Sequence, residues 1–357
     1  MRVGVLGAGQ LGRMLALAGY SLGIDFVFLD PAEGPCAARL GRHIRAPYTD
    51  DRALDELARS VDVATMEFEN VPAETIRDLS AAVPVFPSAN ALAVAQDRLL
   101  EKQLFRRLGI GTAEFAAVDG MAALEAFAKQ GACIVKSRRF GYDGNRQWRI
   151  HRTTDVADAW AAIGDTPLIV ERLVKFDREI SIIAVRGRDG DVSFYPIAEN
   201  QHRDGILALS FSRPGDSMQR KAEDLARRVL EELGYIGTMG VEFFQCGDEL
   251  LANEFAPRVH NSGHWTIEGA VTSQFQNHLR AILGLPLGSC APRGLSVMVN
   301  CVGRLPDRSS ILRIPSAYLH VYDKAPRRGR KVGHVTYVAD NTEAIEQQAS
   351  LIDSLCR

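Results

Sequence analysis

The sequence lacks a charge excess of either sign and lacks any long apolar run. Its 357 residues include 42 basic and 44 acidic side chains, which give a formal net charge of -2. This balance argues against a nucleic-acid partner, because such proteins carry strongly basic surfaces. No apolar stretch is long enough for a signal peptide or a membrane span. We therefore expect a cytoplasmic protein with no membrane partner.

Cysteine is also sparse. Six cysteines are scattered without a Cys-x-x-Cys pair, and the chain has neither internal repeats nor low-complexity linkers. This pattern argues against a disulfide framework and a cysteine zinc site. What is present is the composition of a globular protein, 46% hydrophobic and 24% charged. A chain of this length favours two or three domains, with ligands bound in a cleft between them.

The N-terminal part alternates short apolar runs with amphipathic segments. The runs lie at 3–6, 26–29, 61–66 and 83–86. Such alternation is typical of βαβ units on a parallel sheet. A helical pattern then runs from Ser88 to a glycine cap at Gly109.

These patterns predict an α/β and α+β protein of three domains. A Rossmann-like domain with a parallel sheet covers residues 1–95. A larger domain covers 96–290 and includes a small lid at about 113–168. A strand-rich C-terminal domain, residues 291–357, completes the substrate site.

A glycine-rich turn follows the first apolar run. Gly7, Gly9 and Gly12 lie between a predicted strand and a predicted helix, so backbone N–H groups there can approach a phosphate. Asp30 ends the next predicted strand, where an acid holds a ribose hydroxyl in dinucleotide-binding folds. These features leave an NAD-binding oxidoreductase open. The alternative is that the glycines only permit a tight turn.

A lysine-bearing strand precedes a second glycine loop. Lys136 ends the run Ile134-Val135-Lys136, and the loop follows at 138–147. A lysine beside such a loop can hold nucleotide phosphates while the loop closes over them. The alternative is a hairpin with a solvated basic tip.

Two carboxylates lie on successive predicted strands. Glu242 and Glu254 are each flanked by apolar residues, and an unpaired buried charge is costly. Mg²⁺ suits such a pair, since it binds a few carboxylate oxygens together with substrate phosphates. Solvent-facing or arginine-paired acids are the alternative.

Two polar segments follow. Residues 255–265 are rich in hydrogen-bonding side chains and lack regular periodicity, which favours a substrate-binding loop. His260 and His264 have the spacing of a metal pair on a helix, but Ser262 and Gly263 argue against a helix there. The basic turn at 324–331 is either a solvated charge run or a phosphate clamp.

In order and spacing these motifs closely resemble the 5-(carboxyamino)imidazole ribonucleotide synthetase family. The resemblance spans nearly the whole chain and is most specific from Pro257 to Trp265. Its segments are Gly7–Gly12, Asp97-Arg98, Lys136, 141–144, 171–174, Asn253-Glu254, 256–265 and 329–334. One departure is that Asn145 and Arg146 stand where the family loop has a basic residue and then glycine.

The resemblance implies an ATP-grasp fold that begins with a pre-ATP-grasp domain, and a homodimer. It implies a carbon–nitrogen ligase that uses ATP with Mg²⁺, bicarbonate and 5-aminoimidazole ribonucleotide. The product would be 5-(carboxyamino)imidazole ribonucleotide, formed through carboxyphosphate in purine biosynthesis, with release of ADP and phosphate. Alternatives are another ATP-grasp carboxylase or a formate-dependent transformylase, an NAD-binding oxidoreductase, and a nucleotide-binding regulatory module without turnover.

The resemblance also implies roles for individual residues. Those for ATP are Arg98, Lys136, Gly141, Tyr142, Asp143, Gly144, Asn145, Arg146, Gln147, Glu171, Arg172, Leu173, Val174, Glu179, His202, Asn253 and Glu254. Those for the ribonucleotide are Gln10, Glu69, Asn261, Lys324, Arg330 and Lys331. The catalytic set is Tyr142, Asp143, Arg258 and His260, with Asp143 as general base toward the amine, and Glu242 and Glu254 bind the metal.

Overall fold

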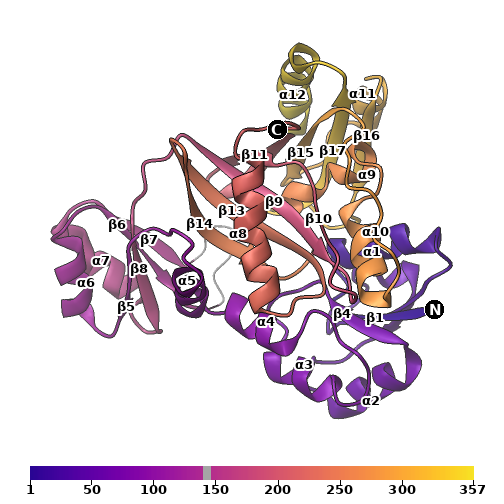
Figure 1. The fold of residues 1–357 in the computed structure, drawn as a ribbon, viewed down its shortest axis with the longest axis horizontal. Coiled ribbons are helices and arrows are strands. Elements are labelled where there is room, and N and C mark those ends of the chain that lie inside the picture. Colours follow the sequence, from indigo (N-terminus) through magenta and orange to yellow (C-terminus); the bar gives the residue numbers. More distant parts are fainter. Residues whose placement is uncertain (140–145) are drawn as a thin grey trace.

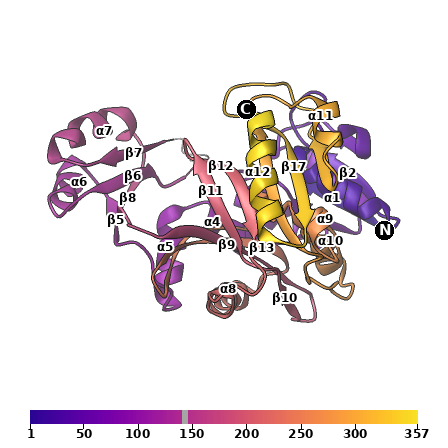
Figure 2. The same ribbon diagram turned by 90° about the horizontal axis from the view of Figure 1, so that it is seen from above.

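The computed structural model describes residues 1–139 and 146–357, which form three β-sheets. Figure 1 shows three lobes, with the lid at the left, the N-terminal domain at the lower right and the C-terminal strands at the top. Figure 2 shows that the lid projects from one end of the molecule. No helix in the described part of the chain is long and apolar enough to cross a membrane.

The N-terminal sheet is parallel, as predicted. Its strands are β1 (Arg2–Leu6), β2 (Asp25–Leu29), β3 (Arg42–Ile44) and β4 (Val63–Met66), in the order β3-β2-β1-β4. Its helices are α1 (Gln10–Tyr20), α2 (Asp51–Ser60) and α3 (Ala73–Leu79), and a 3₁₀ turn spans Ala38–Leu40.

Two predictions in this domain are corrected. The sheet uses β3, which the sequence pattern did not reveal, whereas the run 83–86 makes only a single bridge between Val85 and Ala64. Pro84 and Pro87 flank this bridge. Proline has no N–H to donate, so the ladder cannot extend in either direction.

The single long helix predicted from Ser88 to Leu108 is two helices, α4 (Ala89–Ala95) and α5 (Arg98–Arg107). Asp97 has an extended backbone, and its side chain accepts hydrogen bonds from the N–H groups of Leu99 and Leu100. It therefore caps a new helix. Gly109, with a φ of 66°, follows the end of α5 as predicted.

The lid is a small antiparallel sheet covered by two helices. Its strands are β5 (Phe115–Val118), β6 (Cys133–Ser137), β7 (Gln147–Ile150) and β8 (Leu168–Arg172), in the order β5-β8-β6-β7. Helices α6 (Met121–Ala128) and α7 (Val156–Ile163) pack on Cys133 and Val135, and a 3₁₀ turn spans Thr153–Asp155. Because side chains alternate along a strand, Lys136 faces away from this core.

A nine-stranded sheet forms the body of the molecule. Its strands are β9 (Arg178–Arg186), β10 (Val192–Phe194), β11 (Ala198–Arg203), β12 (Ile206–Ser212), β13 (Gly237–Cys246), β14 (Glu249–Ala256), β15 (Leu295–Val302), β16 (Ala317–Val321) and β17 (Lys331–Ala339). The order is β14-β13-β9-β11-β12-β15-β17-β16, with β10 beside β9. The C-terminal strands therefore extend this sheet through the pairing of β15 with β12.

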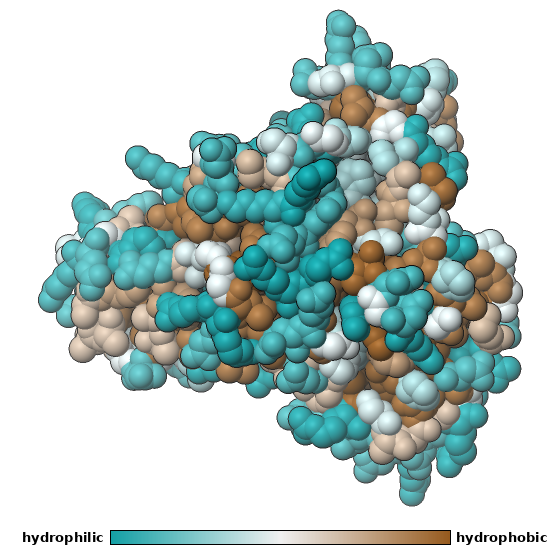
Figure 3. Space-filling view, in the orientation of Figure 1, coloured by the Kyte–Doolittle hydropathy of each residue, from teal (hydrophilic) through white to brown (hydrophobic). Residues whose placement is uncertain are grey.

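Helices pack on both faces of the body sheet. They are α8 (Gln219–Glu232), α9 (Thr266–Gly269), α10 (Gln274–Leu283), α11 (Arg308–Leu312) and α12 (Thr342–Cys356), with a 3₁₀ turn at Asn261–Gly263. Helix α8 buries its apolar stripe on β9 and β13, and Figure 3 shows the largely hydrophilic face that carries it. Helix α10 packs against α1 and so joins the N-terminal domain to the body.

Candidate active site

A buried carboxylate on the lid is paired with two lysines. Glu171 on β8 forms ion pairs with Lys136 Nζ on β6 at 2.8 Å and with Lys102 Nζ on α5 at 3.1 Å. Burial alone would raise the pKa of Glu171, but the two ammonium groups lower it to about 2. The site therefore contains a fixed anion beside the lysine that was predicted to hold phosphates.

Helix α5 places Arg98 beside this cluster. The Arg98 N–H donates to Arg138 O at 3.0 Å, and its guanidinium donates to Ser137 O at 3.1 Å. Arg138 in turn donates two hydrogen bonds to Asp97, the helix cap, at 3.0 and 2.6 Å. The cap thus fixes both the start of α5 and the end of the strand that carries Lys136.

Glu242 and Glu254 lie directly opposite each other on β13 and β14. Burial and the nearby Glu254 carboxylate raise the pKa of Glu242 to about 7. In residues 1–139 and 146–357, no three acids, histidines or cysteines come together as a metal site. Two facing carboxylates, with the pKa of Glu242 raised by its surroundings, fit a Mg²⁺ ion whose other ligands would be phosphate oxygens and water.

Two histidines contact the acids of this region. His202 on β11 pairs with Glu179 on β9. Burial lowers the pKa of His202, but the contact with Glu179 outweighs burial and raises it overall. His260 is different, because burial and the nearby Arg258 hold its pKa well below the usual range.

The neutral His260 has a defined orientation. Its Nε2 lies 3.3 Å from Glu242 Oε1, and its Nδ1 lies 2.8 Å from Ser262 Oγ. Nδ1 also accepts from Ser262 N–H at 3.4 Å, so the neutral ring carries its proton on Nε2, the atom that faces Glu242. Ser262 therefore fixes the orientation in which His260 lies against Glu242.

The residues predicted for the ribonucleotide gather where the N-terminal domain meets the basic turn. Arg258 pairs with Glu69 at 2.8 Å, and Lys324 Nζ contacts the amide oxygen of Gln10. Asn261 exchanges two hydrogen bonds with Asn300 on β15, at 2.7 and 3.1 Å. Three separate parts of the chain thus supply this side of the site.

The basic turn places the cations of Lys324, Arg330 and Lys331 close to one another on this side of the site. Gly329 has a φ of 74° and Arg330 N–H donates to Arg327 O, which closes the turn between β16 and β17. Burial lowers the pKa of Lys324, and the charges of Arg330 and Lys331 lower it further. A partly buried lysine near two other cations is suited to bind an anion.

The amides of Ala8, Gly9 and Gly12 in the glycine turn are occupied by carboxylates of the protein itself. Ala8 N–H donates to Asp30 Oδ2 at 2.8 Å, and Gly9 N–H donates to Glu67 Oε1 at 2.7 Å. A Cβ on Gly7 or Gly9 would lie 2.8 or 2.7 Å from the Glu67 side chain. The glycines are therefore needed to admit a buried carboxylate, and this geometry does not support the dinucleotide-binding alternative.

Some predicted residues are placed elsewhere or lie outside the described residues. Gly141, Tyr142, Asp143, Gly144 and Asn145 are outside them. The Arg172 guanidinium stacks on Phe127 at 4.2 Å and donates to Gly131 O at 2.7 Å, so its side chain braces the lid. Arg146 approaches Asp165 at 3.5 Å.

Sequence reasoning missed Lys102 and Glu67. Lys102 lies four residues after Arg98, on the same face of α5, and this spacing could have identified it. Glu67 lies two residues before Glu69 at the end of β4, where acids near a glycine turn could have suggested a carboxylate for its amides.

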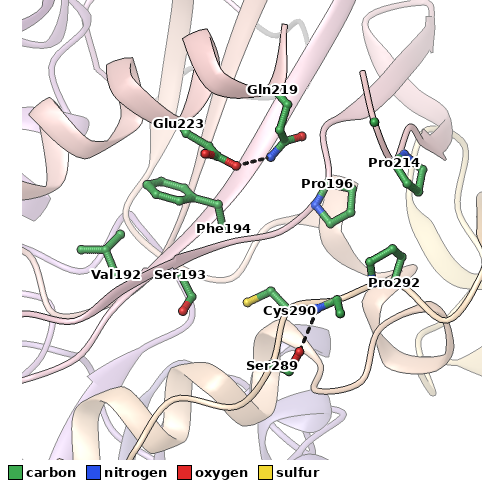
Figure 4. A pocket seen from close by; sticks show the side chains of 12 residues that line it. Val192, Ser193, Phe194, Pro196, Pro214, Gln219, Glu223, Ser289, Cys290 and Pro292 are labelled. Carbon is green, nitrogen blue, oxygen red and sulfur yellow. Dashed lines mark hydrogen bonds between the residues drawn. The ribbon is translucent and has the colours of Figure 1, made fainter. Parts of the chain in front are cut away.

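A cavity of about 510 Å³ lies apart from these residues (Figure 4). It is lined mainly by β10, the start of α8 and the segment 289–292. In Figure 4 the Gln219 amide bonds to Glu223, and Phe194 lies beside them. The lining residues include none of those predicted to bind ATP or the ribonucleotide.

A small sheet that carries Lys136, set beside a larger sheet with paired carboxylates, defines the ATP-grasp class. Family models agree for the ATP-grasp domain at residues 103–275 and the ribonucleotide synthetase preATP-grasp domain at 1–96. A third, the phosphoribosylaminoimidazole carboxylase C-terminal domain, matches 296–348. The chain belongs to the N5-carboxyaminoimidazole ribonucleotide synthase family, and it is an ATP-dependent, ADP-forming ligase.

Relatives support this assignment along the whole chain. The synthase of Pseudomonas aeruginosa is 49% identical and that of Brucella melitensis 45%; they cover 99% and 95% of this chain, and 99% and 97% of their own. The Thermus thermophilus synthetase structure has a TM-score of 0.94 at 50% identity, covering 99% and 98% of the two chains. The structure of the Aspergillus clavatus synthase in complex with ADP and 5-aminoimidazole ribonucleotide has a TM-score of 0.92 at 33% sequence identity. The match covers 99% of this chain and 98% of that one.

Proposed function

We propose that this protein carboxylates 5-aminoimidazole ribonucleotide with ATP and bicarbonate, releasing ADP and phosphate, in purine biosynthesis. One observation supports this proposal above all. A chain of this family carries a lysine on the lid that can bind phosphate, two facing carboxylates on the body sheet and a separate basic turn. The lid lysine and the basic turn could each bind the phosphate of a different substrate. Two phosphate-binding regions favour a nucleotide ligase over a regulatory module without turnover.

ATP binds between the lid and the body sheet in this proposal. Lys136 and Arg98 hold the phosphates, while the segment 171–174 lies along the adenine and Glu179 and His202 lie near the ribose and nucleotide. Phosphoryl transfer depends on positioning and charge neutralisation. The pairing of Asp97 with Arg138 supports this assignment, because it keeps Arg98 next to the strand of Lys136.

Glu242 and Glu254 hold Mg²⁺ in this proposal, together with ATP. The ion would neutralise charge that develops on the phosphates during transfer. The raised pKa of Glu242 supports the assignment, since two carboxylates that face each other on adjacent strands favour a cation between them. Asn253 lies beside Glu254 on the same strand, and the His260 ring lies against Glu242 with Nε2 3.3 Å from its Oε1.

The ribonucleotide binds at the basic turn. Lys324, Arg330 and Lys331 take its phosphate with Gln10, and Glu69, Arg258 and Asn261 contact the rest of the molecule or the carboxyphosphate. The closed lid keeps water from that labile intermediate. The roles of Tyr142 and Asp143, with Asp143 accepting the proton of the amine, stay predictions from the sequence.

A coupled ADP-release assay tests the proposal. ADP release should require both 5-aminoimidazole ribonucleotide and bicarbonate. Formate in place of bicarbonate should give only background release, which separates this reaction from a formate-dependent transformylase. Release that depends on formate, or a change in nicotinamide absorbance, would overturn the proposal.

We propose that the protein is a homodimer that uses the groove between α1 and α10, where β16 contributes His320. The groove, about 210 Å³, is lined in part by Leu17, Phe275 and His320. Tyr20 on α1 and Tyr318 on β16 are exposed. Exposed apolar side chains gathered around a groove mark interaction surfaces.

We also propose a cytoplasmic location. All six cysteines are free thiols, which suits a reducing compartment.

A further inference from the structure

Lys102 is a buried lysine that has no role in the proposed binding of ATP or of the ribonucleotide. It lies on α5 with 1% of its surface exposed. Its ammonium contacts Glu171 Oε2 at 3.1 Å and donates to Asn253 O at 2.7 Å and Ala252 O at 3.2 Å. Lys102 therefore joins the lid strand β8 to the body strand β14, next to Glu254.

The two lysines on Glu171 differ in their freedom to move. The Lys136 side chain is 15% exposed, whereas that of Lys102 is 2% exposed and is also held by two backbone carbonyls. Lys136 has Glu171 as its partner in this structure. Its ammonium has three N–H donors, so when Lys136 holds the phosphates of ATP, all or part of its charge is withdrawn from Glu171.

That exchange creates an electrostatic problem. The Glu171 side chain is 4% exposed, and a buried carboxylate without a cation is strongly destabilised. If Lys136 were its only partner, ATP would compete against the full energy of that ion pair. A second cation that remains in place removes most of this competition.

We propose that Lys102 is a positioning residue, the permanent counter-ion of Glu171, which allows Lys136 to pass from Glu171 to the ATP phosphates. This inference rests on the proposed function, since it assumes that Lys136 binds ATP. A purely structural Lys102 would only hold β8 to β14. The two roles differ in one respect: only the first makes ATP affinity depend on the charge of Glu171.

The test compares ATP binding by calorimetry in four proteins. Lys102→Met removes the charge with little change in length, and Lys129→Met makes the same substitution at an exposed position on the lid. The Kd for ATP should rise about tenfold or more in Lys102→Met and stay unchanged in Lys129→Met. The double variant Lys102→Met/Glu171→Gln also removes the Glu171 carboxylate, which Lys102→Met leaves without its permanent counter-ion. It should recover a large part of the lost affinity for ATP.

Steady-state kinetics provide a second readout. Lys102→Met should raise the KM for ATP more than the KM for the ribonucleotide, and the double variant should reduce that difference. A Lys102→Arg variant, which keeps the cation, should bind ATP better than Lys102→Met does.

The outcomes are distinguishable. If the unmodified protein does not bind ATP, the proposed function fails. If it binds ATP and Lys102→Met binds equally well, or the double variant binds no better than the single one, the role of Lys102 is wrong. If Lys102→Met fails to fold and the double variant folds and binds ATP, the rescue supports the proposal; a double variant that does not fold contradicts it.

Discussion

At the scale of residues, the chemistry of the site depends on which charges are left facing each other. Two lysines keep Glu171 ionised by lowering its pKa, whereas burial and the neighbouring Glu254 carboxylate raise the pKa of Glu242. The same side-chain type therefore has opposite pKa shifts on the two sheets. Two predictions concern the acids of the body sheet.

The first prediction concerns Glu254. Glu254→Gln keeps the shape of the side chain and removes its charge, so ADP release should fall by about 100-fold or more while the fold is retained. Glu249→Gln, at an exposed position on the same strand, should release ADP normally. Near-normal turnover by folded Glu254→Gln would rule out its role as a metal ligand.

The second prediction concerns pH. The pKa of Glu242 is raised from 4.5 to about 7, so the folded protein binds this proton more tightly than the unfolded chain does. Its contribution to the free energy of unfolding is therefore present below pH 4.5 and is lost as the pH rises through about 7.

Mg²⁺ should change this dependence, because the ion favours the ionised form of Glu242. Thermal unfolding with and without Mg²⁺ should show a larger stabilisation at about pH 8 than at about pH 6. Glu242→Gln should lose most of that difference. Equal stabilisation by Mg²⁺ at both pH values in the unmodified protein would contradict the assignment.

At the scale of elements, short connections carry much of the site. Asp97 caps a new helix, α5, and the start of this helix sets the direction in which the Arg98 and Lys102 side chains point. The turn between β16 and β17 brings Lys324 toward Gln10, a contact across 314 positions of sequence. Each connection is a local feature that positions a side chain to contact a residue far away in the sequence.

The third prediction concerns that basic turn. Lys324→Ala and Arg330→Ala should each raise the KM for 5-aminoimidazole ribonucleotide by about tenfold to a hundredfold, since a charged hydrogen bond contributes about 1.5–3 kcal/mol. The Kd for ATP should stay nearly unchanged. Arg328→Ala, at the exposed tip of the turn, is the control. Unmoved KM values in both variants would mean that the phosphate is bound elsewhere.

At the scale of the whole molecule, three lobes surround the site (Figure 1). The α1–α10 contact joins the N-terminal domain to the body, and a hydrogen bond that His278 Nε2 donates to Thr65 Oγ1, 2.9 Å long, strengthens it. Lys102 joins the lid to the body from the other side. The body sheet thus holds both the residues of the N-terminal domain proposed to bind the ribonucleotide and those of the lid proposed to bind ATP.

The fourth prediction concerns assembly. Leu17→Glu places a charge in the groove between α1 and α10 and should shift the protein from dimer to monomer in light scattering coupled to size-exclusion chromatography. Leu351→Glu is a matched control, because Leu351 is 45% exposed and Leu17 46%, but Leu351 lies on α12. A dimer that persists in Leu17→Glu would place the interface on another surface.

Local patterns in the sequence determined the parallel N-terminal sheet, the lysine strand and the paired acids. These follow from alternation along strands and from turn residues, which act between near neighbours. The prolines at 84 and 87 and the cap at Asp97 were also local signals, but the periodicity around them concealed the broken strand and the divided helix.

Only the tertiary structure decided which charges would be paired. Glu67 fills the glycine turn from 58 residues away, and Lys102 reaches the carbonyl of Asn253 across 151. A sequence pattern indicates that a carboxylate or a lysine is present on a strand or helix. Its partner depends on how sheets and helices pack, because burial turns weak attractions between distant residues into strong ones.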